Sequence, residues 1–207
     1  MFRMRAPLSL VAVLMVIAMV LGVLIGGRLV QDWNSFHTPA PAGGGPQSDL
    51  AQLEARPFQL TQLKAGDICA DGPTDSSGRY GTGPVHGIPT GAHTETSWGT
   101  YFDLRLATDP NLTGLVLVRA RDLGTNQPFV FTGQYAAGPV VGTDTLSGQT
   151  VAQHSYLVLD MAHPPGKPSS DQQVIWDFRA GAPTGFSGCF GWQFDGPGFT
   201  ENFRFLL

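Results

Sequence analysis

The first pattern along the chain is an apolar run close to its N-terminus. Residues 8–25 are almost entirely apolar, and Arg3 and Arg5 precede them. As a helix, a run of this length covers roughly 27 Å, close to the thickness of the hydrocarbon core of a bilayer. We therefore predict a single transmembrane helix over residues 8–27. Residues 1–7 would form a cytoplasmic stub, because basic flanking residues favour the cytoplasmic side.

A cleaved signal peptide is the alternative explanation for this run, although its apolar region is normally only about 7–15 residues long. Ala18, Gly22 and Gly26 follow one another at intervals of four residues. This spacing places the three small residues on one face of the helix, where a second helix could pack closely. A structural subunit of a membrane complex is therefore one possible role for the chain.

The positions after residue 56 follow the two-residue period of β-strands. In the segment from Tyr101 to Leu106, apolar residues alternate with Asp103 and Arg105, whereas residues 115–118 are apolar on both faces. Shorter apolar segments follow up to the C-terminus, at residues 58–60, 129–131, 156–159, 174–178, 190–194 and 199–206. Seven to nine short strands separated by turn residues predict a mostly β fold, an antiparallel β-sandwich of immunoglobulin-like or jelly-roll-like type.

Composition agrees with this pattern and defines the limits of the domain. The chain has 27 Gly and 16 Pro but only 14% charged residues, which favours turns and short strands over long helices. Residues 28–56 are rich in Pro and Gly and predict a tether, with a short helix from Asp49 to Ala55 capped by Ser48. Residues 57–207 are then the extracytoplasmic β-sandwich domain.

The C-terminal strands resemble those of a known group of proteins. Gly188-Cys189-Phe190 and Trp192-Gln193-Phe194-Asp195-Gly196 resemble the closing hairpin of immunoglobulin-like ectodomains on bacterial single-pass membrane proteins. The resemblance covers about a fifth of the chain. It implies a fold and a topology, with the domain outside the cell membrane, and it implies no activity.

The chain has two cysteines, Cys69 and Cys189, and both follow the predicted membrane helix. In an oxidising compartment two such cysteines most simply form one disulfide. The alternative is that Cys189 is the nucleophile of an exported cell-envelope enzyme. Ser187-Gly188-Cys189 resembles part of the Ser-His-Gly-Cys site of L,D-transpeptidases, but Ser187 stands where that site has histidine, and no activating base is adjacent.

Residues 71–99 lack a strand pattern and predict a long loop, the first candidate for a binding site. The segment contains five side chains suited to contacting a ligand: Arg79, Tyr80, His86, His93 and Trp98. A zinc site built from His86, His93, His154 and a carboxylate is the alternative, but no pair of these histidines has the short spacing that metal ligands usually show. We predict no metal, no cofactor and no catalytic residue.

Charge narrows the class of partner. Of 12 Lys and Arg, Arg3 and Arg5 precede the membrane segment, which leaves 10 against 16 Asp and Glu in the rest of the chain. An excess of six negative charges argues against nucleic acid as a partner. The sequence favours a membrane-anchored extracytoplasmic binding module for a cell-envelope glycan or protein. An exported enzyme that uses Cys189 or a histidine-bound metal is the main alternative.

Overall fold

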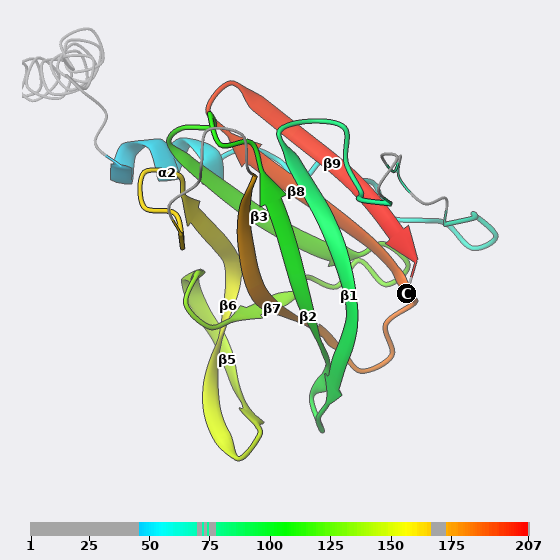
Figure 1. The fold of residues 1–207 in the computed structure, drawn as a ribbon. Coiled ribbons are helices and arrows are strands. Elements are labelled where there is room, and N and C mark those ends of the chain that lie inside the picture. The colour runs from blue at the N-terminus through cyan, green and yellow to red at the C-terminus, as the bar shows by residue number, and fades with distance from the viewer. Residues whose placement is uncertain (1–45, 70–71, 73, 75–77, 167–172, 207) are drawn as a thin grey trace, which may run out of the picture. The chain divides into compact units, whose positions relative to one another are not determined.

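The computed structural model describes residues 46–69, 72, 74, 78–166 and 173–206 (Figure 1). All of them belong to a unit that begins at Gly45. The described elements are one helix and nine strands: α2 (Pro46–Glu54), β1 (Val85–Glu95), β2 (Gly99–Thr108), β3 (Leu115–Asp122), β4 (Val130–Thr132), β5 (Ala136–Leu146), β6 (Gln149–Asp160), β7 (Val174–Pro183), β8 (Cys189–Gly196) and β9 (Phe199–Leu206). The predicted mostly β fold is confirmed.

The predicted transmembrane helix, residues 8–27, lies outside the described residues. The same is true of the stub at residues 1–7, of residues 28–45 of the tether, and of Ala18, Gly22 and Gly26. No helix within the described part of the chain is both long enough and apolar enough to cross a membrane.

Every strand pair is antiparallel, and hydrogen bonds connect the strands in the order β1-β2-β7-β4-β6-β3-β8-β9, with β5 paired to β6. The prediction of two separate sheets differs from this arrangement, because strand pairing connects all nine described strands into one sheet, eight of them along one path and β5 through β6. A single residue pair, Phe131 with His154, links β4 to β6. We therefore describe the sheet as two halves, β1-β2-β7-β4 and β5-β6-β3-β8-β9, joined at this pair.

The two halves face each other across an aromatic core. Phe178 of β7 and Phe131 of β4 both contact Trp192 of β8, each with its ring centroid 5.9 Å from that of the tryptophan. Phe102 of β2 lies 5.7 Å from Phe190 of β8 by the same measure. The aromatic residues of β8 and β9 fill this core, although Phe199 is only partly buried.

The sheet nearly closes on itself where β1 approaches β9. The backbone of Tyr80 exchanges two hydrogen bonds with Gly87 of β1, of 2.9 and 2.8 Å. The ring of Tyr80 stacks on Phe203 of β9 at a centroid distance of 6.2 Å. The carboxylate of Glu201, also on β9, accepts hydrogen bonds from three backbone N–H groups, those of Thr82, Gly83 and Val85. This contact region is the β1–β9 seam.

Three local predictions need correction. The predicted loop at residues 71–99 contains the whole of β1, which the sequence hides because two glycines and a proline interrupt it and its register shifts between Pro89 and His93. Residues 58–60 form no strand. The short helix begins at Pro46, so Ser48 lies within it rather than at its N-cap; proline is well tolerated in the first turn of a helix.

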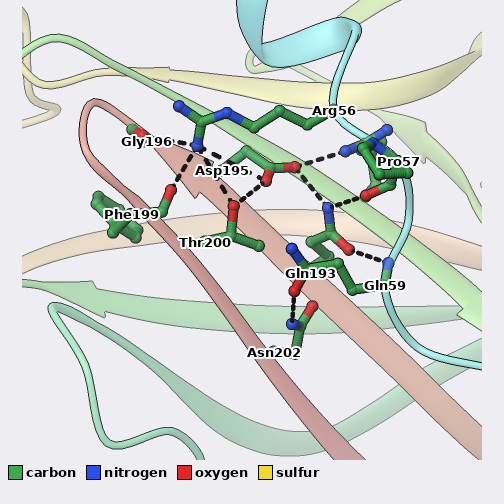
Figure 2. Close-up of polar contacts among 10 residues, drawn as sticks. Arg56, Pro57, Gln59, Gln193, Asp195, Gly196, Phe199, Thr200 and Asn202 are labelled. Atoms are coloured by element: carbon green, nitrogen blue, oxygen red, sulfur yellow. Dashed lines mark hydrogen bonds and ion pairs between the residues drawn. The ribbon is translucent and has the colours of Figure 1, made fainter.

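A polar network fixes the segment that enters the domain to β8 (Figure 2). The backbone N–H of Gln59 donates to Oε1 of Gln193 at 2.6 Å, and Nε2 of Gln193 donates to the carbonyl of Pro57 at 2.9 Å. Arg56 reaches the turn between β8 and β9, where its Nη1 donates to the carbonyl of Phe199 at 2.6 Å. Residues 56–59 therefore lie along β8 as an ordered strap.

The centre of this network is the carboxylate of Asp195, which is fully buried (Figure 2). Arg119 Nη2 donates to Asp195 Oδ2 at 2.6 Å, and Thr200 Oγ1 donates to Oδ1 at 2.7 Å. Arg56 adds a second guanidinium, with Nη1 3.9 Å from Oδ1. A buried charge requires such partners because its removal from water is costly.

Candidate functional site

Four charged side chains form a ladder on the face of β2 and β7 that turns away from the core. Arg179 Nε donates to Asp103 Oδ1 at 2.6 Å, and Arg105 Nε donates to Asp177 Oδ1 at 2.7 Å. The register explains both contacts, because Asp103 is paired with Arg179 and Arg105 with Asp177 in the two strands. Successive residues of a strand point to opposite faces, so the alternate positions are left for the core. The ladder contains two acids and two bases and is neutral as a whole.

A groove of about 400 Å³ lies over this ladder and is lined by three of its members, Asp103, Asp177 and Arg179. The other lining residues supply hydroxyl, amide, backbone and apolar groups: Thr90 of β1, Leu104 of β2, Thr132 of β4, Gly133, Gln134, Leu146 of β5, Val151 of β6 and Phe178 of β7. We call this feature the ladder groove. Its volume falls within the range typical of sites for small ligands.

A second pocket, of about 300 Å³, adjoins the ladder groove and shares Thr90, Asp103 and Leu104 with it. His93 and Phe102 also line this pocket, with their ring centroids 6.5 Å apart. The bulge of β1 brings Thr90 to both cavities, and the hydroxyl of Thr90 donates to the carbonyl of Asp103. An extended ligand could therefore continue from the groove into the pocket.

The apolar wall of the ladder groove belongs to a small hydrophobic cluster separate from the main core. Its buried members are Tyr101, Val130 and Leu146, and Trp98 and Val151 pack against them. The ring centroids of Trp98 and Tyr101 lie 5.5 Å apart. The cluster holds the β5–β6 hairpin against the ladder face of the sheet.

Buried polar contacts strengthen this wall. Gln153 Nε2 donates to the hydroxyl oxygen of Tyr101 at 2.6 Å. Asp144 of β5 accepts a hydrogen bond from Thr96 Oγ1 at 2.6 Å and so connects the hairpin to the β1–β2 turn. Burial, together with the nearby Asp144 carboxylate, raises the pKa of Tyr101 to about 12.

The five residues predicted to bind a ligand do not form one site. Three of them lie towards the β1–β9 seam. Tyr80 stacks on Phe203 there, Arg79 Nη1 donates to the side chain of Gln173, and His86 Nδ1 is 3.2 Å from the carbonyl of Gly81. None of these three lines the ladder groove.

The other two predicted residues lie beside the ladder groove. His93 lines the adjoining pocket, and Trp98 belongs to the cluster that forms the apolar wall. The charged residues of the groove were not predicted as site residues. The strand pattern had placed Asp103 and Arg105 on a polar face, but no sequence signal shows that β7 carries Asp177 and Arg179 opposite them.

Cys69 and Cys189 form a disulfide, with an S–S distance of 2.01 Å and a Cα–Cα distance of 5.7 Å. The prediction of this bond is confirmed. The alternative role of Cys189 as a nucleophile is wrong for this state of the protein, because a disulfide sulfur is no thiolate. The bond connects the segment after the strap to the start of β8.

Within the described part of the chain, no three His, Cys, Asp or Glu side chains gather as metal ligands would. Each carboxylate of the ladder accepts a hydrogen bond from a guanidinium. The groove is thus suited to holding a ligand through hydrogen bonds. Comparison with protein families, curated proteins and solved structures finds no match to this chain.

Proposed function

We propose that the protein is a non-catalytic binding module whose ligand lies in the ladder groove. The observation that carries the proposal is the guanidinium–carboxylate contact between Arg179 and Asp103 at the floor of a cavity of about 400 Å³, with the Asp177 carboxylate of the neighbouring pair beside it. Charged groups donate and accept stronger hydrogen bonds than neutral ones do. A ligand rich in hydroxyl groups can bond to both kinds of charge without bringing a charge of its own.

A neutral glycan is the class of ligand that fits this groove best. Two Asp and one Arg of the ladder line the groove, and the fourth member, Arg105, neutralises Asp177 from beside it, so neither an anionic nor a cationic ligand meets a net opposite charge there. The hydroxyls of Thr90 and Thr132 and the amide of Gln134 add uncharged partners. Leu146 and Val151 offer an apolar surface for the C–H face of a sugar ring.

The compartment that we propose is the outer side of the cell membrane. The Cys69–Cys189 disulfide supports it, because stable disulfides are typical of exported domains. The apolar run at residues 8–25 and its flanking arginines support a membrane anchor. We also propose that the fold is immunoglobulin-like, which agrees with the facing halves of the sheet and with the resemblance of the closing hairpin. A cell-envelope glycan would be within reach of such a domain.

Two-dimensional ¹H–¹⁵N NMR of the isolated domain, residues 46–207, tests the proposal with a chitin hexasaccharide as the neutral probe. We expect saturable shifts at the backbone amides of Asp103, Thr132 and Arg179. The Arg179→Gln variant should lose these shifts. The matched control Lys64→Gln, which removes an exposed cation outside the groove, should retain them.

A panel of neutral hexasaccharides of other sugars extends the test beyond one probe. A hexaglutamate peptide and a hexalysine peptide serve as the charged comparison. If the groove amides shift with either peptide and with none of the sugars, the glycan assignment is wrong. If no probe and no fraction of neutral envelope glycan perturbs these amides, the ladder groove is not a binding site of this kind.

A further inference from the structure

The pocket that adjoins the ladder groove differs from the groove in the charge of its walls. Charged residues of both signs line the groove, since Asp103, Asp177 and Arg179 all border it. Among the described residues that line the pocket, Glu95 and Asp103 are acidic, and none is Lys or Arg. We call this feature the Glu95 pocket. Its volume of about 300 Å³ is sufficient for the end group of a ligand that lies in the groove.

The register of β1 and β2 determines which side chains share this pocket. His93 is paired with Phe102, and two residues further along β1, Glu95 is paired with Thr100. Residues directly opposite each other in antiparallel strands project from the same face of the sheet, as do residues two apart in one strand. The imidazole, the carboxylate and the ring of Phe102 therefore belong to one face. This face turns towards the core, because Phe102 contacts Phe190 of β8.

The carboxylate of Glu95 has no partner within the described part of the chain. Its side chain is exposed and forms no hydrogen bond or ion pair with any described residue. Asp103, by contrast, accepts a hydrogen bond from Arg179 Nε at 2.6 Å, and the guanidinium neutralises its charge. The Glu95 pocket therefore retains one negative charge that no described basic residue pairs with. This charge attracts a cation and repels an anion.

Two phenylalanine rings form the apolar part of the same pocket. Phe186 is only partly buried, and its ring meets that of Phe102 edge to face at a centroid distance of 5.9 Å. Phe102 also contacts His93, with the ring centroids 6.5 Å apart. The face of an aromatic ring attracts a cation that lies within about 6 Å of its centroid. A carboxylate beside aromatic rings is therefore a combination that suits an ammonium group.

The position of Glu95 distinguishes it from an ordinary solvated acid. An exposed carboxylate alone indicates no site, because charged side chains usually face water. Asp49, for example, is exposed and lines neither the groove nor the pocket. Glu95 stands at the wall of a pocket that contains the two rings and that shares Thr90 and Asp103 with the ladder groove. A ligand in the groove could therefore extend to Glu95.

We propose that the Glu95 pocket is the subsite for a primary ammonium group carried at one end of the glycan that lies in the ladder groove. The ammonium donates a hydrogen bond to the carboxylate of Glu95, and the ring of Phe186 contacts its charge. The imidazole of His93 supplies a further acceptor when it is uncharged. No covalent step is involved. This inference rests on the proposed function, because the groove holds the neutral remainder of the glycan.

Isothermal titration calorimetry of the full-length chain in detergent solution tests the inference with three probes. The first is the unmodified chitin hexasaccharide. The other two carry one primary amine each, as a 2-aminoethyl glycoside at the reducing end or as a 6-amino-6-deoxy sugar at the non-reducing end, so that both directions of the glycan in the groove are covered. We expect one amino probe to bind about five- to tenfold more tightly than the unmodified sugar at low salt. This gain in affinity should shrink as added salt screens the charges.

Three variants locate the ammonium group. Glu95→Gln should reduce the gain to less than about twofold, because the amide keeps the shape of the side chain but not its charge. Phe186→Leu should reduce the gain about twofold through loss of the aromatic ring. Asp49→Asn is the matched control, since it removes an exposed negative charge outside both cavities, and it should retain the full gain.

Two results overturn the inference while the proposed function stands. In one, the unmodified hexasaccharide binds and neither amino probe binds more tightly; in the other, an amino probe binds more tightly and Glu95→Gln retains the whole gain. If none of the three probes binds, the inference is overturned as well, and the panel of neutral hexasaccharides then decides separately whether the proposed function survives.

Discussion

Asp103 and Arg179 are paired across β2 and β7, with Arg179 Nε donating to Asp103 Oδ1 at 2.6 Å, yet both side chains remain partly open to solvent. An ion pair in this situation adds little to stability, because water and salt screen it. In the proposed function, this pair contacts a ligand from the floor of the ladder groove.

We therefore predict that a double-mutant cycle with Asp103→Asn and Arg179→Gln gives a coupling of only about 0.2–1 kcal/mol in the free energy of unfolding. Urea denaturation of the four proteins at low and moderate salt measures it. A coupling well above this range that persists in salt would show that the pair mainly stabilises the fold, and it would weaken the assignment of the groove.

The buried ion pair between Arg119 and Asp195 should behave differently. Asp195 is fully buried, and removal of Arg119 leaves its carboxylate with only the more distant guanidinium of Arg56, 3.9 Å away. We expect Arg119→Met to lower the free energy of unfolding by about 3–5 kcal/mol. Arg105→Met, at an exposed pair that water and salt screen, is the matched control and should cost far less. Similar losses for the two variants in urea denaturation would contradict this contrast.

Whether a feature of the fold or of the groove can be predicted from the sequence depends on how far apart in the chain its residues lie. The alternation of Leu104 and Leu106 with Asp103 and Arg105 is local, and it predicted correctly which face of β2 is polar. The two cysteines permit only one intramolecular pairing, so their bond was also predictable. The register that brings Arg179 to Asp103 depends on a strand far away in the chain and has no local signal.

Glycine and proline account for most of the missed elements. β1 contains Gly87, Pro89 and Gly91, and Gly91 has a φ of 73° that few other residues adopt. β5 begins with Ala-Ala-Gly-Pro and its register shifts twice, so no alternating pattern marks it. Both strands lie at edges of the sheet, where such residues are tolerated because one side needs no hydrogen bonds. The β1 bulge that carries Thr90 into the groove was thus hidden from pattern analysis.

The disulfide should contribute strongly to stability because it joins residues 120 positions apart. In the chain-entropy model a loop of this length corresponds to about 4–5 kcal/mol, although measured values are often smaller. We expect Cys69→Ser, Cys189→Ser and the double variant to lose similar amounts, since either single change already removes the bond. Urea denaturation of the three variants measures this. A parent protein whose stability is unaffected by a reductant would contradict the expectation.

The carboxylate of Asp122 should make stability depend on pH in the acid range. Burial alone would raise its pKa, but hydrogen bonds from Ser187, Thr125 and Gly124 outweigh this effect and hold the pKa below its usual value. A lowered pKa in the folded state means that the stabilisation is complete above the unfolded value of about 4 and is lost as the pH falls through the folded value.

The measurement is the difference in free energy of unfolding between the parent and Asp122→Asn, followed from pH 7 to acid. We expect the difference to be constant above about pH 5 and to shrink below about pH 4. Asp144 and Asp160 also have lowered pKa values, but they are present in both proteins and cancel in the difference. A difference that stays constant down to the lowest pH would show that Asp122 does not titrate as proposed.

The hydroxyl of Tyr101 should determine how firmly the β5–β6 hairpin closes one side of the ladder groove. It accepts a hydrogen bond of 2.6 Å from Gln153, which is only 2% exposed. In Tyr101→Phe the Gln153 amide loses this partner in a buried place, at a cost of about 1–3 kcal/mol. Because Leu146 and Val151 of the same hairpin line the groove, the amides of β5 and β6 near them should exchange hydrogen faster in this variant.

Tyr156→Phe, in which the lost hydroxyl donates to Glu54 at an exposed position, is the matched control and should leave exchange at the groove unchanged. Equal exchange at Leu146 and Val151 in the parent and in Tyr101→Phe would mean that the apolar cluster alone holds the wall.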